Sequence, residues 1–331
     1  MKIAVTGGAG FIGSHFIKYI LGKYPGYRVL NIDKLTYAGN PENLDEVKNN
    51  QDYSFVKEDI CDRKEIEKAV EGCDVIVNFA AESHVDRSID EPEVFLKTDV
   101  FGTFNLLEIC RSRGIGKYIQ IGTDEIYGSA DGGETFSEES PLNPSNPYSA
   151  SKASADLLVL SYCRTYGLPV NVIRSTNNYG PNQYPEKFIP LFITNAVEDK
   201  RLPLYGDGRN VRDWLFVRDN CAGIDAVLHK GRDGEVYNIA GENEKENIFV
   251  ARKILEYLGK SEELIQFVKD RPGHDRRYSI SCEKVKKLGW TQNTSLEDGL
   301  KMTVEWYKSH RNWWERIKSG EFLKYYKKHY K

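Results

Sequence analysis

The stretch KIAVTGGAGFIG, residues 2 to 13, decides the fold. Its first five residues form an apolar, β-branched run of the kind that becomes a short buried strand. Glycines follow at Gly7, Gly8, Gly10 and Gly13, which fits the spacing of a tight turn between a strand and a helix. Because such a turn lets the backbone approach a pyrophosphate closely, the stretch predicts a dinucleotide site that opens a helix over residues 11–23.

A second predicted strand, residues 28–32, supports this interpretation because it ends at Asp33, twenty residues after Gly13. An acid at that place accepts hydrogen bonds from the adenosine ribose hydroxyls and repels a 2'-phosphate, so it favours NAD. A glycine-rich turn without a ligand is the alternative, and the strand, turn, helix and acid in sequence make it the weaker one.

Further short apolar runs predict strands at residues 53–57, 75–79, 118–121 and 170–174, with helical patterns between them. Strands that alternate with helices indicate an α/β fold with a doubly wound parallel Rossmann sheet. The alternation breaks at the turn-rich segment 177–182. We therefore expect an NAD-binding domain over residues 1–175 and a smaller mixed α/β substrate domain over 176–331, with part of about 210–240 returning to the first domain.

Three side chains predict the chemistry. Tyr148 and Lys152 lie one turn apart in a helix that an Asn-Pro pair begins, so both point to the same face. A positive charge beside a tyrosine stabilises the phenolate, which otherwise forms only near pH ~10. Thr123, just after the strand at 118–121, supplies a hydroxyl for the same substrate oxygen. This trio predicts proton removal from an alcohol during hydride transfer, although Tyr and Lys also share this spacing in ordinary amphipathic helices.

The overall composition limits which partners and which cellular compartment we expect. The net charge of −3 gives no general electrostatic reason to expect nucleic acid or a membrane surface. No apolar run approaches the ~18 residues of a membrane span, and the chain becomes glycine-rich too early for a signal peptide. The six cysteines are scattered without a C-x-x-C pair, and the histidines have no metal-ligand spacing. We expect a cytoplasmic protein with reduced thiols and no metal site.

Four longer motifs extend along nearly the whole chain: AAESHVDRS at 80–88, TDEIYG at 123–128, NNYGP at 177–181 and RPGHDRRY at 271–278. Together with the glycines, Asp33, Thr123 and the Tyr148-x-x-x-Lys152 pair, they resemble the extended short-chain dehydrogenase/reductases that act on nucleotide sugars. Within these, the motifs are similar to those of the dTDP-glucose 4,6-dehydratase family. One departure is Gly122, where this family pattern leads us to expect serine.

The resemblance implies an NAD-dependent hydro-lyase that converts dTDP-glucose to dTDP-4-keto-6-deoxyglucose and water in deoxysugar biosynthesis. Oxidation at C4 acidifies the C5 hydrogen, a base then removes it while an acid protonates the leaving C6 hydroxyl, and hydride returns to C6. Asp124 is the implied acid and Glu125 the implied base. Acids directly after a strand also commonly cap a turn, which is the structural alternative for this pair.

The resemblance also implies which residues bind the ligands. The implied NAD contacts are Gly7, Gly10, Phe11, Ile12, Gly13, Asp33, Lys34, Leu35, Thr36, Asp59, Ile60, Ala80, Ala81, Ser83, Thr98, Tyr148, Lys152 and Asn178. The implied nucleotide-sugar contacts are Ser83, His84, Thr123, Asn177, Lys187, Phe188, Pro203, Tyr205, Arg212, Asn247, Arg271 and His274. Several of these are cations suited to a diphosphate, and Tyr205 is suited to the base. An ordinary surface or packing role is equally open for each sugar contact, and no catalytic role is predicted for His84.

Two other classes of function stay open from the sequence. A nucleotide-sugar 4-epimerase, or a 4,6-dehydratase that uses another nucleotide, would share Thr123, Tyr148 and Lys152. Epimerisation needs no acid and base pair, so Asp124 and Glu125 favour the dehydratase. A non-catalytic NAD-sensing or RNA-binding relative fits poorly with an intact catalytic trio. The resemblance further implies a homodimer formed by helices of the first domain.

Overall fold

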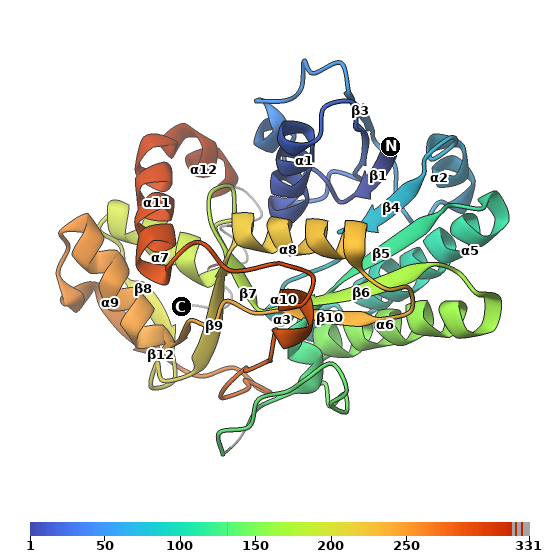
Figure 1. The fold of residues 1–331 in the computed structure, drawn as a ribbon. Helices are drawn as coiled ribbons and strands as arrows, with labels where there is room; N and C mark the ends of the chain where they lie inside the picture. Colours follow the sequence, from blue (N-terminus) through green and yellow to red (C-terminus); the bar gives the residue numbers. More distant parts are fainter. Residues whose placement is uncertain (131, 320–321, 323–325, 327–331) are drawn as a thin grey trace.

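The computed structural model describes residues 1–130, 132–319, 322 and 326 of the chain. Seven parallel strands form the main sheet, in the order β10-β6-β5-β4-β1-β2-β3 (Figure 1). They are β1 (Lys2–Thr6), β2 (Arg28–Ile32), β3 (Tyr53–Val56), β4 (Val75–Asn78), β5 (Lys117–Thr123), β6 (Val170–Ser175) and β10 (Val236–Ile239). The predicted doubly wound parallel sheet is confirmed. Its strand order reverses at β1, which places a ligand crevice between the carboxyl ends of β1 and β4.

Both faces of this sheet are covered, so most residues of its inner strands are buried. Ile3 packs in one core cluster with Phe16 and Ile224, and its neighbour Ala4 packs in another with Leu106 and Val159. The first cluster lies under α1 and α8, and the second under α2, α5 and α6 (Figure 1). These helices are α1 (Phe11–Lys23), α2 (Arg63–Ala69), α5 (Thr103–Arg113), α6 (Pro147–Tyr166) and α8 (Val217–Lys230).

A second lobe lies beside the sheet and has its own aromatic core, which includes Phe192, Trp214 and Trp314 (Figure 1). It contains a three-stranded sheet, β11-β9-β7, and a two-stranded one, β12-β8. Its elements are β7 (Asn177–Tyr179), α7 (Phe188–Val197), β8 (Leu202–Tyr205), β9 (Val211–Phe216), β11 (Glu244–Glu246), α9 (Asn247–Leu258), β12 (Ile265–Val268), α11 (Leu296–Ser309) and α12 (Arg311–Ile317). None of the helices in the described part of the chain is long and apolar enough to cross a membrane.

Short elements connect these layers. They are α3 (Val85–Asp90), α4 (Pro92–Phe95), a π-helix at Leu96–Gly102, α10 (Glu283–Lys286) and 3-10 helices at Pro41–Leu44, Asp124–Tyr127 and Glu262–Leu264. The helix α6 begins at a capping box, in which the side chains of Asn146 and Ser149 each accept from the other's backbone N–H. It ends at Gly167, whose φ of 68° is the left-handed conformation that favours glycine. These local signals fix the bounds of the helix that carries Tyr148 and Lys152.

Candidate active site

A cavity of about 300 Å³ opens at the carboxyl ends of β1, β2, β4 and β5. All the predicted catalytic residues line it, and so do all the predicted cofactor residues except Leu35. Leu35 has a φ of 57° and its backbone N–H donates to Asp33 Oδ1 at 2.8 Å, so it shapes the loop behind the acid. The structure therefore brings the predicted catalytic and cofactor residues to one place.

The glycine-rich turn packs closely against neighbouring backbone on one side and faces the cavity on the other. A Cβ at Gly7, which has a φ of 69°, would lie 2.6 Å from the Ala80 nitrogen, and one at Gly13 would lie 2.5 Å from the Gly7 oxygen. Gly10, the N-cap of α1, faces the cavity, and no side chain caps the first turn. Backbone N–H groups at such a helix start bind anions, so this turn fits a pyrophosphate.

Asp33 stands at the end of β2 with both carboxylate oxygens oriented by the backbone. Its Oδ2 accepts from the Ala9 N–H at 2.9 Å, and Oδ1 accepts from Leu35. Burial raises the pKa of Asp33, and these two N–H groups oppose the shift. The carboxylate lines the cavity, and each of its oxygens retains a lone pair for a ribose hydroxyl.

Tyr148 and Lys152 are almost fully buried at the floor of the cavity, with 8% and 4% of their surfaces exposed. Lys152 Nζ donates to the Ile121 carbonyl at 2.7 Å, which fixes the ammonium beside β5. Burial raises the pKa of Tyr148 well above its ordinary value, and the charges of Glu125 and Asp99 add to the shift. Hydrogen bonding from the Thr123 hydroxyl opposes it. The phenol and the threonine hydroxyl line the same cavity.

The carboxyl pair that follows β5, a buried Asp124 and a partly buried Glu125, lies in two different electrostatic surroundings. Burial raises the pKa of Asp124 well above its ordinary value, and the charges of Glu125 and Asp213 raise it further. Burial also raises the pKa of Glu125, but three cations oppose that shift, namely Arg271, Lys187 and Arg212. Asp124 is thus held protonated more strongly than Glu125. Carboxyl groups whose surroundings differ in this way can act as an acid and a base.

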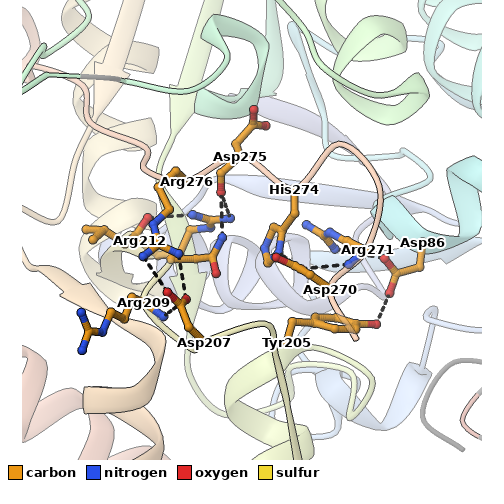
Figure 2. A network of polar contacts seen from close by, with 12 residues as sticks. Asp86, Tyr205, Asp207, Arg209, Arg212, Asp270, Arg271, His274, Asp275 and Arg276 are labelled. Atoms are coloured by element: carbon orange, nitrogen blue, oxygen red, sulfur yellow. Dashed lines mark hydrogen bonds and ion pairs between the residues drawn. The ribbon is translucent and has the colours of Figure 1, made fainter. Parts of the chain in front are cut away.

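A second polar cluster, formed by Asp86, Tyr205, Arg271 and His274, lies next to the carboxyl pair. Figure 2 shows that Arg271 and Tyr205 converge on Asp86, with Arg271 Nη1 3.1 Å from Oδ1 and Tyr205 Oη donating to Oδ2 at 3.2 Å. The ring of His274 stands edge-on to Tyr205, with 5.9 Å between the ring centroids. Burial and the charge of Arg271 lower the pKa of His274 to about 4, so the imidazole is neutral at neutral pH.

Most of the remaining predicted sugar contacts stand outside the cavity lining. Arg212 lies over the Tyr278 ring at 4.2 Å, and its Nη2 donates to the Asp275 carbonyl at 2.9 Å. Phe188 stacks on Trp214, with 5.8 Å between the centroids. The others occupy separate positions: His84 directly precedes α3, Pro203 lies in β8, and Asn247 begins α9. Ser83, Thr123, Asn177 and Lys187 do line the cavity, and Lys187 Nζ donates to the Ser83 carbonyl.

Several buried polar atoms at these positions find no hydrogen-bond partner within the described part of the chain. Asp124 Oδ2 and Glu125 Oε2 are two of them, at the centre of the site. Asn177 Oδ1, Asn178 Oδ1 and Arg271 Nε are others. Buried polar atoms are normally satisfied, so this concentration of unpaired atoms fits a polar ligand.

Comparison with known proteins agrees with this geometry. The family model for GDP-mannose 4,6 dehydratase matches residues 4–303. The chain is 49% identical over 326 residues to the dTDP-glucose 4,6-dehydratase of Streptomyces niveus, an alignment that covers 97% of each protein. The crystal structure of the dTDP-glucose 4,6-dehydratase from Streptomyces venezuelae, with NAD and TYD bound, is 48% identical with a TM-score of 0.94, over 96% of this chain and 100% of that one. The chain belongs to the dTDP-glucose 4,6-dehydratase family.

The resemblance stated from the motifs is thereby confirmed. The same scaffold also serves an epimerase at lower identity. The UDP-glucose 4-epimerase of Thermus thermophilus, in complex with NAD, is 30% identical with a TM-score of 0.87, over 94% of this chain and 100% of that one. The fold is thus common to both activities. On chemical grounds, elimination needs an acid and a base that epimerisation does not, and in this chain Asp124 and Glu125 are the predicted pair.

The sequence did not predict a role for two acids near the trio, the buried Asp99 and the partly buried Glu82. Asp99 accepts from Ser151 Oγ at 2.7 Å and from the Glu82 N–H at 2.9 Å, and burial raises its pKa to about 6 against the charge of Lys152. Burial and Asp99 raise the pKa of Glu82 to about 7. A lone acid in the half-apolar run VFLKTDVFG, residues 94–102, was the available signal, and Asp99 lies in the π-helix, a rare element that often marks a functional site.

Proposed function

We propose that this protein converts dTDP-glucose to dTDP-4-keto-6-deoxyglucose and water. The observation that carries the proposal is the placement of Asp124 and Glu125 beside Thr123, Tyr148 and Lys152 in one cavity, with the two carboxyls in different electrostatic surroundings. Alcohol oxidation uses the last three residues, and loss of water from the adjacent carbons uses the first two.

NAD is the cofactor that the cavity fits best. The uncapped start of α1 at Gly10 would hold the pyrophosphate, and Asp33 would hold the adenosine ribose. When bound, NAD would accept hydride from C4 of the sugar and return it to C6. Because the hydride returns, the reaction has no net redox change, and the cofactor can stay bound through the cycle.

In the proposed mechanism, different side chains of the protein carry out the separate proton transfers. Tyr148 takes the proton of the C4 hydroxyl while Thr123 holds the same oxygen. Glu125 removes the C5 proton, which the C4 ketone has acidified, and Asp124 protonates the departing C6 oxygen. The raised pKa of Asp124 fits its role as the acid, and the three cations that oppose the shift of Glu125 favour its carboxylate form, which fits the base.

The cations around Glu125 would bind the diphosphate of the substrate. Arg212, Arg271 and Lys187 come from three separate segments, and all act on the same carboxylate. Tyr205 and His274 supply aromatic surfaces beside Arg271 for the base. The other implied ligand contacts, and the division into domains at residue 175, stay predictions.

Mass spectrometry of the nucleotide sugar tests this function. We expect dTDP-glucose incubated with the protein and NAD to lose the mass of one water, with no net accumulation of reduced NAD. UDP-glucose is the matched comparison, because thymine and uracil differ by one methyl group, which is worth only about 1–3 kcal/mol in a pocket. An unchanged mass together with a new isomer would contradict the proposal and favour the epimerase.

The carboxyl pair gives the reaction a predictable dependence on pH. We expect kcat/KM to rise as Glu125 loses its proton and to fall at higher pH as Asp124 loses its own, because both pKa values are raised and that of Asp124 is raised further. Arg212→Gln removes a cation that lowers the pKa of Glu125, so the acidic limb should move to higher pH. A pH profile of product formation measures the limb.

Arg209→Gln is the control for this prediction, because Arg209 lies three residues away in sequence and its side chain is exposed. Its acidic limb should match that of the wild type. An acidic limb that stays in place in Arg212→Gln would show that Arg212 does not act on the base.

We also propose that the protein is a homodimer in the cytoplasm. Leu157 on α6 and Leu96 and Phe101 on the π-helix are large apolar side chains that are about half exposed, and these two helices pack together. A second copy of the chain would cover them. The free state of all six cysteines supports a reducing compartment.

Sedimentation tests the dimer. Leu157→Glu should convert the protein to a monomer because it places a charge on the proposed contact. Phe267→Glu, at an equally exposed phenylalanine in β12 of the second lobe, should leave the mass unchanged. A wild type that sediments as a monomer at micromolar concentration would reject the dimer.

A further inference from the structure

Asp275, in the segment that follows β12, contacts two parts of the site that are far apart in the chain. Its carbonyl accepts from Arg212 Nη2 at 2.9 Å and from Asn210 Nδ2 at 3.2 Å. Its carboxylate points away from Arg212 (Figure 2), and Oδ2 accepts from Ser145 Oγ at 2.6 Å and from Tyr278 Oη at 2.8 Å. Only 9% of Asp275 is exposed, so water competes little for these contacts. One residue therefore connects a cation of the proposed diphosphate site with the loop that precedes α6.

The contact with Ser145 lies next to the helix start that carries Tyr148. Ser145 Oγ accepts from Asn146 Nδ2 at 3.3 Å, and Asn146 is the N-cap of α6. Tyr148 is the second residue of that helix. The Asp275 oxygen accepts from two hydroxyls at short distances, and hydrogen bonds to a carboxylate are about twice as strong as neutral ones. Asp275 can therefore hold the first turn of α6 in place.

Arg212 acts on Asp275 through two separate contacts. Its guanidinium donates to the Asp275 carbonyl, and it also lies over the ring of Tyr278 at 4.2 Å. The hydroxyl of Tyr278 donates in turn to the Asp275 carboxylate. In the proposed function Arg212 binds the diphosphate of the substrate. Because an arginine that turns toward a diphosphate would change both contacts, ligand binding should change the position of Asp275.

We propose that Asp275 is a positioning residue that couples occupation of the diphosphate site to the placement of Tyr148. This inference rests on the proposed function. With the diphosphate bound, Arg212 fixes Asp275, and Asp275 fixes Ser145 through its carboxylate. The first turn of α6 then holds the phenol at the C4 hydroxyl of the sugar. Part of the binding free energy of the nucleotide is thus used at the reacting carbon, where it raises the rate of oxidation.

Ser145→Ala tests the coupling because it removes the hydroxyl on the α6 side and leaves the contacts of Asp275 with Arg212 and Tyr278. Three quantities are measured. Calorimetry gives the dissociation constant of dTDP. Amide hydrogen exchange of residues 145–150, with and without saturating dTDP, reports how firmly the helix start is held. Single-turnover reduction of NAD at saturating dTDP-glucose reports oxidation.

In the wild type, we expect dTDP to slow the amide exchange of residues 145–150. In Ser145→Ala this protection should be lost, and NAD reduction should fall about tenfold, while the dissociation constant of dTDP stays within about twofold. Ser145→Thr, which keeps a hydroxyl, should restore both the protection and the rate. Ser154→Ala is the matched control on the same helix, because its exposed hydroxyl donates to the Ala150 carbonyl at 2.8 Å, and it should behave as the wild type.

Two results would overturn the coupling alone. One is a wild type that dehydrates dTDP-glucose but shows no protection of residues 145–150 by dTDP. The other is a Ser145→Ala variant that keeps the wild-type rate of NAD reduction at saturation, whatever its affinity for dTDP. A wild type that forms no dehydrated product from dTDP-glucose would overturn the proposed function itself, and the coupling with it.

Discussion

Glu125→Gln is expected to leave the reduction of NAD by dTDP-glucose within about tenfold of the wild type while slowing the loss of water by about 10³-fold. Glutamine has the shape of glutamate but cannot take the C5 proton. In the proposed mechanism the oxidation step uses Thr123, Tyr148 and Lys152, whose positions the substitution does not change. Reduced cofactor should therefore accumulate, because the hydride has no C6 acceptor until water has left.

The two halves of this prediction are measured in one experiment, by following the absorbance of reduced NAD and the mass of the nucleotide sugar together. Glu139→Gln is the control, an exposed acid in the loop that precedes α6. If Glu125→Gln loses water at the wild-type rate, Glu125 is not the base. If NAD reduction collapses as well, the carboxylate takes part in oxidation.

Tyr148→Phe is expected to lower NAD reduction and product formation by the same factor, about 10³-fold. The substitution removes only the hydroxyl that takes the C4 proton, so the first step limits everything after it. The ring itself should stay in place, because it packs edge-on against Phe95 with 6.2 Å between the centroids. Stability should change little, since the oxygen is the only atom removed.

The same two assays, with the thermal midpoint as a third, check this result. Tyr166→Phe is the matched control, at the exposed end of the same helix. Full NAD reduction by Tyr148→Phe would remove Tyr148 from the oxidation step. Together, the two variants separate the steps before the C4 ketone from those after it. Tyr148→Phe should stop before the ketone forms, and Glu125→Gln should stop after it has formed.

The parts of the fold that were predictable from the sequence depend on local signals. The helix α6 could be placed from Asn146, Pro147 and Gly167, because caps and left-handed glycines act within one turn of the chain. The strand, turn and helix at residues 2–23 followed from apolar runs and glycine spacing in the same way. The predicted trio was proposed from side chains at the end of β5 and in the first two turns of α6, whereas the roles of the carboxyl pair were implied by the family resemblance.

The electrostatic arrangement was not predictable, since it depends on contacts between distant segments. Asp86 and Arg271 are 185 residues apart in the chain, and nothing local to either shows that they meet. The different surroundings of Asp124 and Glu125 depend on Arg212, Lys187 and Asp213, which the fold of the second lobe brings close. Asp99 was missed for the same reason, because its partner Ser151 lies on another helix.

The contact between Asp86 and Arg271 limits how this protein can be recombined with its relatives. Asp86 belongs to the segment that follows the fourth strand of the large sheet, whereas Arg271 and Tyr205 belong to the second lobe. A chimera that exchanges the second lobe must bring a cation to the same place. Without one, it buries a carboxylate with too little compensation, at a cost of about 3–5 kcal/mol. Lobes of this architecture are therefore interchangeable only as charge-matched pairs.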